Sequence, residues 1–352
     1  MTFDGDEIFP VTATVNGHDH LVIGGCDSVE LSKEYGTPLY VYDENTLRVM
    51  CRDFMREFGS RHSDSRVLYA AKAFINPAIA RLVDEEGLGM DVVSAGEIAM
   101  ALAAGFPADK MYFHGNNKSP DELEMAVDSG VGRVVVDNFH ELEILDRIAV
   151  SKGVVQSILL RLSPGVDPHT HAKTTTGVLD SKFGLSIETG DASAAVRQAI
   201  DASGLDLVGL HCHLGSPIFE LEPYSIAVDT VFTFASKFKS DGFTMNEFSP
   251  GGGFAIGYTK HQLPPRVKSY AEVITNAVDN CSERLGMEVP QLLIEPGRSI
   301  VGRAGVALYR VGAIKEIPGV RKYVSLDGGM GDNIRPAMYD AKYEAVSANK
   351  MS

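Results

Sequence analysis

The sequence predicts an α/β protein: a (β/α)8 TIM-type barrel together with an incomplete β-domain built from both chain ends. Short apolar, β-branched runs recur between Arg66 and Arg298, and most are separated by a segment with helical spacing. The runs number eight over roughly 240 residues, which matches the strand count and length of a closed barrel. They are RVLYAAKA, GLGMDVVS, KMYFHGNN, RVVVDN, SILLRLSPG, LVGLHCHLGS, MNEFSPGGGF and QLLIEPGR.

These strands are too apolar to face water on one side, which indicates a parallel sheet covered by helices. A doubly wound open sheet is the alternative, and the count of eight runs favours the barrel. We expect residues 46–305 to form the barrel. Residues 1–45 and 306–352 contain short strand-like runs, so we expect them to form one partial β-domain.

Composition argues against several kinds of partner. The chain of 352 residues carries a formal net charge of -15, which disfavours nucleic acid or an anionic membrane as its main partner. The acidic N-terminus lacks the order of a signal peptide, and no apolar run approaches the ~18 residues that span a bilayer. The cysteines show no paired spacing and suit a reducing compartment, so we expect a cytoplasmic protein. They are Cys26, Cys51, Cys212 and Cys281.

Polar side chains stand at the end of every predicted strand, where a barrel of this kind has its active site. Lys72 is the most informative, because it ends an apolar strand and an ammonium is costly to bury there. An imine with an aldehyde cofactor would remove the charge, and we expect burial to lower the pKa of this amine. The alternative is a lysine that extends to solvent at the barrel mouth. The other strand-end residues are Asp91, Ser94, His114, Asn116, Asn117, Asp137, Asn138, Arg161, His211, His213, Gly251, Gly252, Gly253, Glu295 and Arg298.

The loops after strands seven and eight are the usual phosphate site of this fold. Gly251, Gly252 and Gly253 let backbone amides approach an anion, although such a run is more often a flexible turn. Gly297 and Arg298 follow the neighbouring strand, and the guanidinium can add charge-assisted hydrogen bonds. The combination favours a bound phosphate group.

Glu295 completes the set of residues that a pyridine-containing cofactor needs. A carboxylate beside the pyridine nitrogen keeps that nitrogen protonated, so that the ring accepts electrons when a bond to Cα breaks. The alternative is a structural ion pair with Arg298 or Arg161.

The histidines raise the question of a metal ion. His211 and His213 share one face of a strand, and His169 and His171 repeat the spacing. Catalytic zinc needs three protein ligands and an activated water, and the sequence contains no HExxH. A ring stacked on a flat cofactor explains His213 more simply, so we expect no metal.

A series of motifs runs in order over most of the chain. It comprises YAAKA (69–73), DVVSAGE (91–97), HGNNKS (114–119), GVDPHTHAKTTTG (165–177), SKFG (181–184), GLHCHLGS (209–216), SPGGGF (249–254), EPGRS (295–299) and DGGM…IRPAMYDAKYE (327–344). The series resembles the pyridoxal 5′-phosphate (PLP)-dependent decarboxylases of alanine-racemase-like fold, and most closely the diaminopimelate decarboxylase family. HGNNKS, HCHLGS and IRPAMYDA point to diaminopimelate rather than to ornithine or arginine as substrate.

The resemblance implies a role for each candidate residue. Lys72 forms the Schiff base with PLP, His213 stacks on the ring, and Glu295 pairs with the pyridinium nitrogen. Arg298, Arg335 and Tyr339 contact the substrate carboxylates. The further cofactor contacts are Asp91 and, around the phosphate, Ser216, Gly251, Gly252, Gly253, Gly297 and Arg298.

The implied reaction is decarboxylation of meso-2,6-diaminopimelate at its D-configured carbon, which gives L-lysine and carbon dioxide in the last step of lysine biosynthesis. The resemblance also implies a homodimer with shared active sites.

One departure from the family pattern lies at the end of the chain. The chain stops at EAVSANKMS, where relatives continue into a Cys-Glu-Ser-x-Asp segment and a later tyrosine. In the family that cysteine crosses the dimer interface and serves the partner's site as a proton donor. We therefore expect this chain to lack the C-terminal part of the family and to be poorly active as it stands.

Two alternatives stay open. One is a PLP-dependent enzyme for another amino acid, either a decarboxylase or a racemase. Arg335 and Tyr339 count against a racemase, which needs no pocket for a second carboxylate. The other is a non-catalytic regulatory homologue, but such proteins typically lose the lysine or the phosphate loop, and both are present here.

Overall fold

The computed structural model describes residues 7–167, 176–177 and 180–352, and the chain divides into two compact units. The first unit comprises Met1–Met50, Ile256–Pro264 and Ile300–Ser352, and the second Cys51–Ala255 and Pro265–Ser299. The domain boundaries predicted from the sequence, 46–305 for the barrel and 1–45 with 306–352 for the β-domain, stay a prediction.

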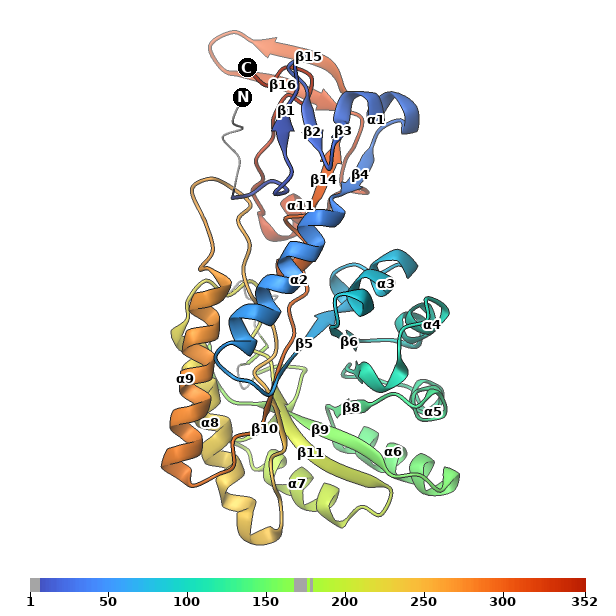
Figure 1. Ribbon diagram of the computed structural model, residues 1–352, viewed down its shortest axis with the longest axis vertical. Helices are drawn as coiled ribbons and strands as arrows, with labels where there is room; N and C mark the ends of the chain where they lie inside the picture. The colour runs from blue at the N-terminus through green and yellow to red at the C-terminus, as the bar shows by residue number, and fades with distance from the viewer. Residues whose placement is uncertain (1–6, 168–175, 178–179) are drawn as a thin grey trace. The chain divides into compact units, whose positions relative to one another are not determined.

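The second unit is built on a closed barrel of parallel strands, which confirms the predicted fold class (Figure 1). The pairing of β8 with β9 and that of β13 with β5 complete the ring. Each of the predicted runs overlaps one barrel strand. In ring order the strands are β5 (Ser65–Ala70), β6 (Gly89–Val92), β7 (Met111–Phe113), β8 (Arg133–Val136), β9 (Gln156–Ser163), β11 (Leu205–Cys212), β12 (Glu247–Ser249) and β13 (Gln291–Ile294), with the short β10 (Leu185–Ser186) beside β9.

Helices alternate with the barrel strands along the chain, and their ends follow local capping rules. Helix α5 begins with a capping box, in which Ser119 and Glu122 each bond the other's backbone N–H. It ends at Gly130, whose φ of 72° is the left-handed conformation that glycine adopts without strain. The helices are α2 (Glu44–Gly59), α3 (Pro77–Glu85), α4 (Ala95–Ala103), α5 (Pro120–Ser129), α6 (Phe139–Lys152), α7 (Asp191–Asp201), α8 (Glu222–Ala235), α9 (Val267–Leu285) and α10 (Arg298–Val301), with 3-10 turns η1 (Ala71–Ala73), η2 (Ala108–Lys110) and η3 (Ser236–Asp241).

The barrel is packed with side chains. One buried cluster takes a single residue from each of six strands: Leu68, Tyr112, Val135, Leu159, Val208 and Leu293. The Tyr112 hydroxyl donates to Glu247 over 3.3 Å, and Arg133 pairs with the same carboxylate at 2.6 Å. These contacts tie β7, β8 and β12 together. Because the barrel is filled, a ligand must bind at its end rather than within it.

The first unit consists of small antiparallel pairings. Strands β1 (Thr14–Val15), β2 (Leu21–Ile23) and β3 (Cys26–Asp27) form one sheet, and β4 (Leu39–Tyr42) pairs with β14 (Gly305–Leu308). The hairpin β15 (Val311–Ile317) and β16 (Arg321–Leu326) is exposed at every residue. The unit also contains the helices α1 (Ser28–Tyr35) and α11 (Arg335–Tyr339). Among the described residues no helix is both long and apolar enough to cross a membrane.

Candidate active site at the carboxyl ends of the barrel strands

Lys72 lies just beyond strand β5, in the 3-10 turn η1. Its side chain is 48% exposed, and its Nζ donates to Asp91 Oδ2 over 2.8 Å. Asp91 stands on the neighbouring strand β6 and is fully buried. The amine is therefore accessible at the barrel mouth while its direction is fixed by a buried carboxylate.

The charge state of Lys72 differs from the sequence-based expectation. Burial by itself lowers the pKa of Lys72, but the carboxylates of Asp91 and Glu295 outweigh burial and raise that pKa above its ordinary value. The expected lowering was wrong because the strand sequence does not reveal the carboxylates that the barrel places around the amine. The amine must lose a proton before it attacks a carbonyl, and Asp91 is in hydrogen-bond contact with that proton.

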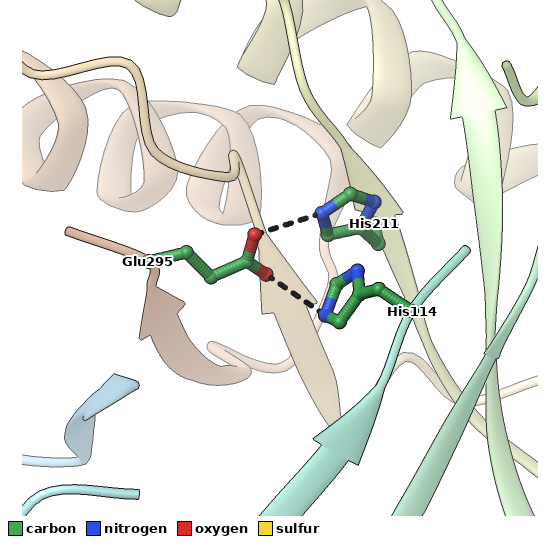
Figure 2. Close-up of side chains that lie close together, drawn as sticks. All are labelled: His114, His211 and Glu295. Carbon is green, nitrogen blue, oxygen red and sulfur yellow. Dashed lines mark hydrogen bonds and ion pairs between the residues drawn. The ribbon is translucent and has the colours of Figure 1, made fainter. Parts of the chain in front are cut away.

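Figure 2 shows Glu295 beside His114 and His211. Glu295 directly follows β13 and is only 5% exposed. Ser249 Oγ donates to its Oε1 over 2.7 Å, and His211 Nε2 lies 3.1 Å from its Oε2. His114 Nε2 is 3.7 Å from Oε1. Burial would raise the pKa of Glu295, but the hydrogen-bond contact with His211 and the charge of the Lys72 ammonium hold that pKa well below its usual range. Glu295 is thus a buried carboxylate that stays ionised.

His114, His211 and Glu295 also form a group that could ligate a metal ion, since one atom from each lies within 4.8 Å of the others. Sequence reasoning did not anticipate this group because His114 stands about a hundred residues before His211. The charged amine of Lys72 interacts with Glu295 and with His114, and it would repel a cation there. Burial lowers the pKa of His114 to about 4, so its ring is neutral. That no metal binds stays a prediction, and His169 and His171 lie outside the described residues.

His213 lies against the glycine-rich loop that follows β12. Its Nδ1 accepts the backbone N–H of Gly252 over 3.2 Å, which places the ring proton on Nε2. Burial lowers the pKa of His213 well below its ordinary value. The ring is therefore a neutral, oriented surface, as stacking on a flat cofactor would require.

The glycine loop is packed too closely for any side chain. A Cβ at Gly252 would lie 2.1 Å from the carbonyl oxygen of Glu295, and one at Gly253 would lie 2.4 Å from that of Gly215. The second contact brings the turn that carries Ser216 beside the loop. A Cβ at Gly297 would lie 2.9 Å from Ala70 Cβ, next to the lysine turn. Close packing explains why glycine is required at these positions, and a need for flexibility does not.

Arg161 and Asp137 form a second buried charge pair at the strand ends. Arg161 is 8% exposed, its Nε lies 3.7 Å from Asp137 Oδ1, and its guanidinium stacks 4.4 Å from the Phe183 ring. Burial lowers the pKa of Arg161. Sequence reasoning named both residues as strand-end groups and gave Arg161 one alternative role, as an ion-pair partner of Glu295. It missed Ser249, for which the only signal was the serine that opens the SPGGGF motif.

Arg335 and Tyr339 belong to the first unit, within helix α11. The Arg335 guanidinium stacks on two rings, 5.6 Å from Tyr339 and 5.2 Å from Tyr258, and its Nε donates to the Tyr343 hydroxyl over 2.8 Å. Sequence reasoning did not anticipate Tyr258 or Tyr343. The cluster holds the guanidinium in a defined orientation.

Comparisons with known proteins identify the relatives of this chain. The family model described as the pyridoxal-dependent decarboxylase, pyridoxal binding domain, matches residues 45–302. Diaminopimelate decarboxylase from Bacillus subtilis is 46% identical over 341 residues, which is 97% of this chain and 78% of the relative. The enzyme from Corynebacterium efficiens is 43% identical over 96% of this chain and 74% of its own length.

Solved structures agree with the sequence relatives. A crystal structure of diaminopimelate decarboxylase from M. jannaschii in complex with L-lysine is similar with a TM-score of 0.88 and 35% identity, covering 95% of this chain and 77% of that one. The Helicobacter pylori enzyme, also complexed with L-lysine, gives a TM-score of 0.82 at 31% identity, covering 90% and 77% of the two chains. The chain therefore belongs to the pyridoxal-dependent decarboxylases, in the diaminopimelate decarboxylase family.

Proposed function

We propose that this protein uses PLP to decarboxylate meso-2,6-diaminopimelate, releasing carbon dioxide and L-lysine. The observation that carries the proposal is the ionised, buried Glu295 on the same barrel rim as the accessible amine of Lys72. When bound, PLP supplies a protonated pyridine ring that takes up the electron pair left behind by a departing carboxylate. The names of the relatives and the lysine in two of their structures support diaminopimelate as the substrate.

The described residues fit the aldehyde carbon, the ring nitrogen and the ring face of PLP. Lys72 would hold the aldehyde carbon, with Asp91 orienting the amine. Glu295 would share a proton with the ring nitrogen, while Ser249 and His211 keep the carboxylate in place. The neutral ring of His213 would lie against the cofactor ring.

The phosphate of PLP would be bound by the closely packed glycine loop and its neighbours. The loop backbone could approach the phosphate closely, because no side chain fits between the loop and the end of β13. The N–H groups of Gly251 and Gly252 donate to Ser249 and His213 in this structure, so they would have to be shared with the phosphate. Arg298 would add a positive charge and could also reach a substrate carboxylate. The residues proposed for this role are Ser216, Gly251, Gly252, Gly253, Gly297 and Arg298.

Arg335 and Tyr339 would contact the substrate carboxylate that does not leave. A guanidinium held between aromatic rings loses little freedom on binding a carboxylate, which favours a specific contact. A second carboxylate distinguishes diaminopimelate from lysine. We therefore propose that Arg335 selects the substrate, and that the barrel residues promote cleavage of the bond between Cα and the departing carboxylate.

We further propose that the protein acts as a homodimer with shared active sites in the cytoplasm. The exposed hairpin β15–β16 supports an interface, because Ile314 is 61% exposed and Val324 is 50% exposed. All four cysteines are free, as suits a reducing compartment.

Replacing Lys72 with alanine tests the cofactor assignment. The parent protein with PLP should release carbon dioxide from meso-diaminopimelate and should show an imine absorbance that borohydride abolishes. Lys72→Ala should lose both properties, because no other amine is proposed to hold the aldehyde. A PLP imine that borohydride reduces and that persists in Lys72→Ala would contradict the assignment.

Replacing Glu295 with glutamine should separate cofactor binding from turnover. The amide is close to isosteric, but it cannot keep the ring nitrogen protonated, so kcat should fall by roughly 10²-fold or more. The PLP affinity, measured by titration of visible absorbance, should change only a few-fold because the phosphate and Lys72 contacts remain. The exposed Glu124 on α5 provides the control, since Glu124→Gln should change neither quantity. Equal turnover in both variants would rule out the proposed role.

Replacing Arg335 with leucine tests substrate selection. D-lysine has the same D-configured carbon with its carboxylate as meso-diaminopimelate, but it lacks the distal carboxylate. The ratio of kcat/KM for meso-diaminopimelate to that for D-lysine should fall at least ~30-fold, the scale of a lost charge-assisted contact. Equal losses on both substrates would show that Arg335 acts on the site in general and not on the distal carboxylate.

Analytical ultracentrifugation tests the proposed dimer. At micromolar concentration the protein should sediment at twice the chain mass, and Ile314→Asp should shift it towards the monomer because a charge would be buried at the interface. Val289→Asp is the control, because it also replaces an exposed aliphatic residue with aspartate, but in the barrel unit. It should leave the sedimentation unchanged. A parent protein that stays monomeric would contradict the proposal.

A further inference from the structure

Lys118 is a buried ammonium that the reaction outlined above does not use. Its side chain is 1% exposed, and its Nζ donates to Glu141 Oε1 over 2.6 Å. It also donates to the carbonyl oxygens of Val135 and Gly115 over 2.8 and 2.9 Å. An ammonium has three N–H groups, so all of them are satisfied inside the protein.

These contacts join two barrel strands at their carboxyl ends. Gly115 is two residues beyond the end of β7, directly after His114, and Val135 lies in β8 two residues before Asp137. Glu141, in the first turn of α6, uses its second carboxylate oxygen to accept the backbone N–H of Asp137 over 3.0 Å. One ion pair therefore ties the ends of β7 and β8 to the start of α6.

Both strand ends carry side chains of the candidate active site. His114 stands beside Glu295, and its ring packs edge-on against His211 with 4.9 Å between centroids. Asp137 faces Arg161 and accepts the backbone N–H of Gly184 over 3.1 Å. A shift of either strand end would move these groups relative to the cofactor ring.

Stability alone is a poor explanation for the ion pair. Burying two charges usually costs as much as their attraction returns, and well-packed apolar residues often stabilise a protein equally well. Burial raises the pKa of Glu141 above its ordinary value even with Lys118 beside it. Desolvation therefore outweighs attraction at this carboxylate, and a positional role accounts better for the pair.

We propose that the buried Lys118–Glu141 ion pair is a positioning device, which holds His114 beside Glu295 and Asp137 beside Arg161. The proposal rests on the proposed function in one respect, namely that Glu295 serves the cofactor ring. Lys118 is a positioning residue, since it acts through the strand ends and contacts no reacting atom.

The test removes both charges at once. The double variant Lys118→Met/Glu141→Leu keeps the approximate volume and leaves no unpaired buried charge. The Gly115 and Val135 carbonyls and the Asp137 N–H lose these partners, so its melting temperature should fall, but by no more than roughly 5 °C. Its kcat for meso-diaminopimelate should fall at least ~10-fold with little change in KM, because small misplacements of catalytic groups cost rate. The visible circular dichroism of bound PLP should also change, and a crystal structure should show His114 Nε2 farther from Glu295 Oε1 than 3.7 Å.

Lys110→Met is the matched control. Lys110 directly precedes the same strand β7 at its other end, and its ion pair with Asp84 at 2.9 Å lies near the surface. This variant should leave kcat, the dichroism of bound PLP and the position of His114 unchanged.

The outcomes separate the two proposals. A double variant that fails to fold, or one with unchanged kcat, dichroism and His114 position, would overturn the positioning role. A parent protein that neither binds PLP nor acts on diaminopimelate would instead overturn the proposed function. The separation between His114 and Glu295 in crystals without PLP would still decide the structural part of the inference.

Discussion

The ionised state of Glu295 is the constraint on which the rest of the candidate site depends. A carboxylate with 5% exposure would ordinarily take up a proton, because burial disfavours the charged form. Ser249 and His211 contact it from two other strands, and the Lys72 ammonium adds a positive charge, while the neutral ring of His114 lies 3.7 Å away beyond the end of β7. This arrangement requires β7, β11, β12 and β13 to end at one level, which the parallel register of a closed barrel provides.

The charges around Glu295 compensate one another at short range. The Lys72 ammonium is held by Asp91, and the Arg161 guanidinium faces Asp137. A chain with a net charge of -15 would repel an anionic cofactor at long range, so the positive charges at the barrel rim must act locally. Burial strengthens such local interactions, because the effective dielectric inside a protein is lower than that of water.

Close packing links the glycine loop, Gly251 to Gly253, to the carboxylate. The backbone of Gly252 approaches the carbonyl group of Glu295 so closely that a Cβ would clash with it. The same residue donates its N–H to His213. The glycine loop, the His213 ring and Glu295 are therefore packed against one another. The glycines are needed because a side chain would clash, and not because the loop must move. Preorganisation of this kind is what a site that stabilises developing charge requires.

The sequence by itself determined the barrel and the positions of Lys72, Glu295 and the glycine loop, because strand period and strand ends are local properties of the chain. It did not determine the raised pKa of Lys72 or the contacts of His114, since the partners come from strands distant in sequence. The buried bonds of Lys118 were equally hidden, because a lysine in a polar loop is indistinguishable from an exposed one until the strands are placed. Only the tertiary structure decided these features, since the strength of a charge interaction depends on distance and burial in space, and neither follows from separation along the chain.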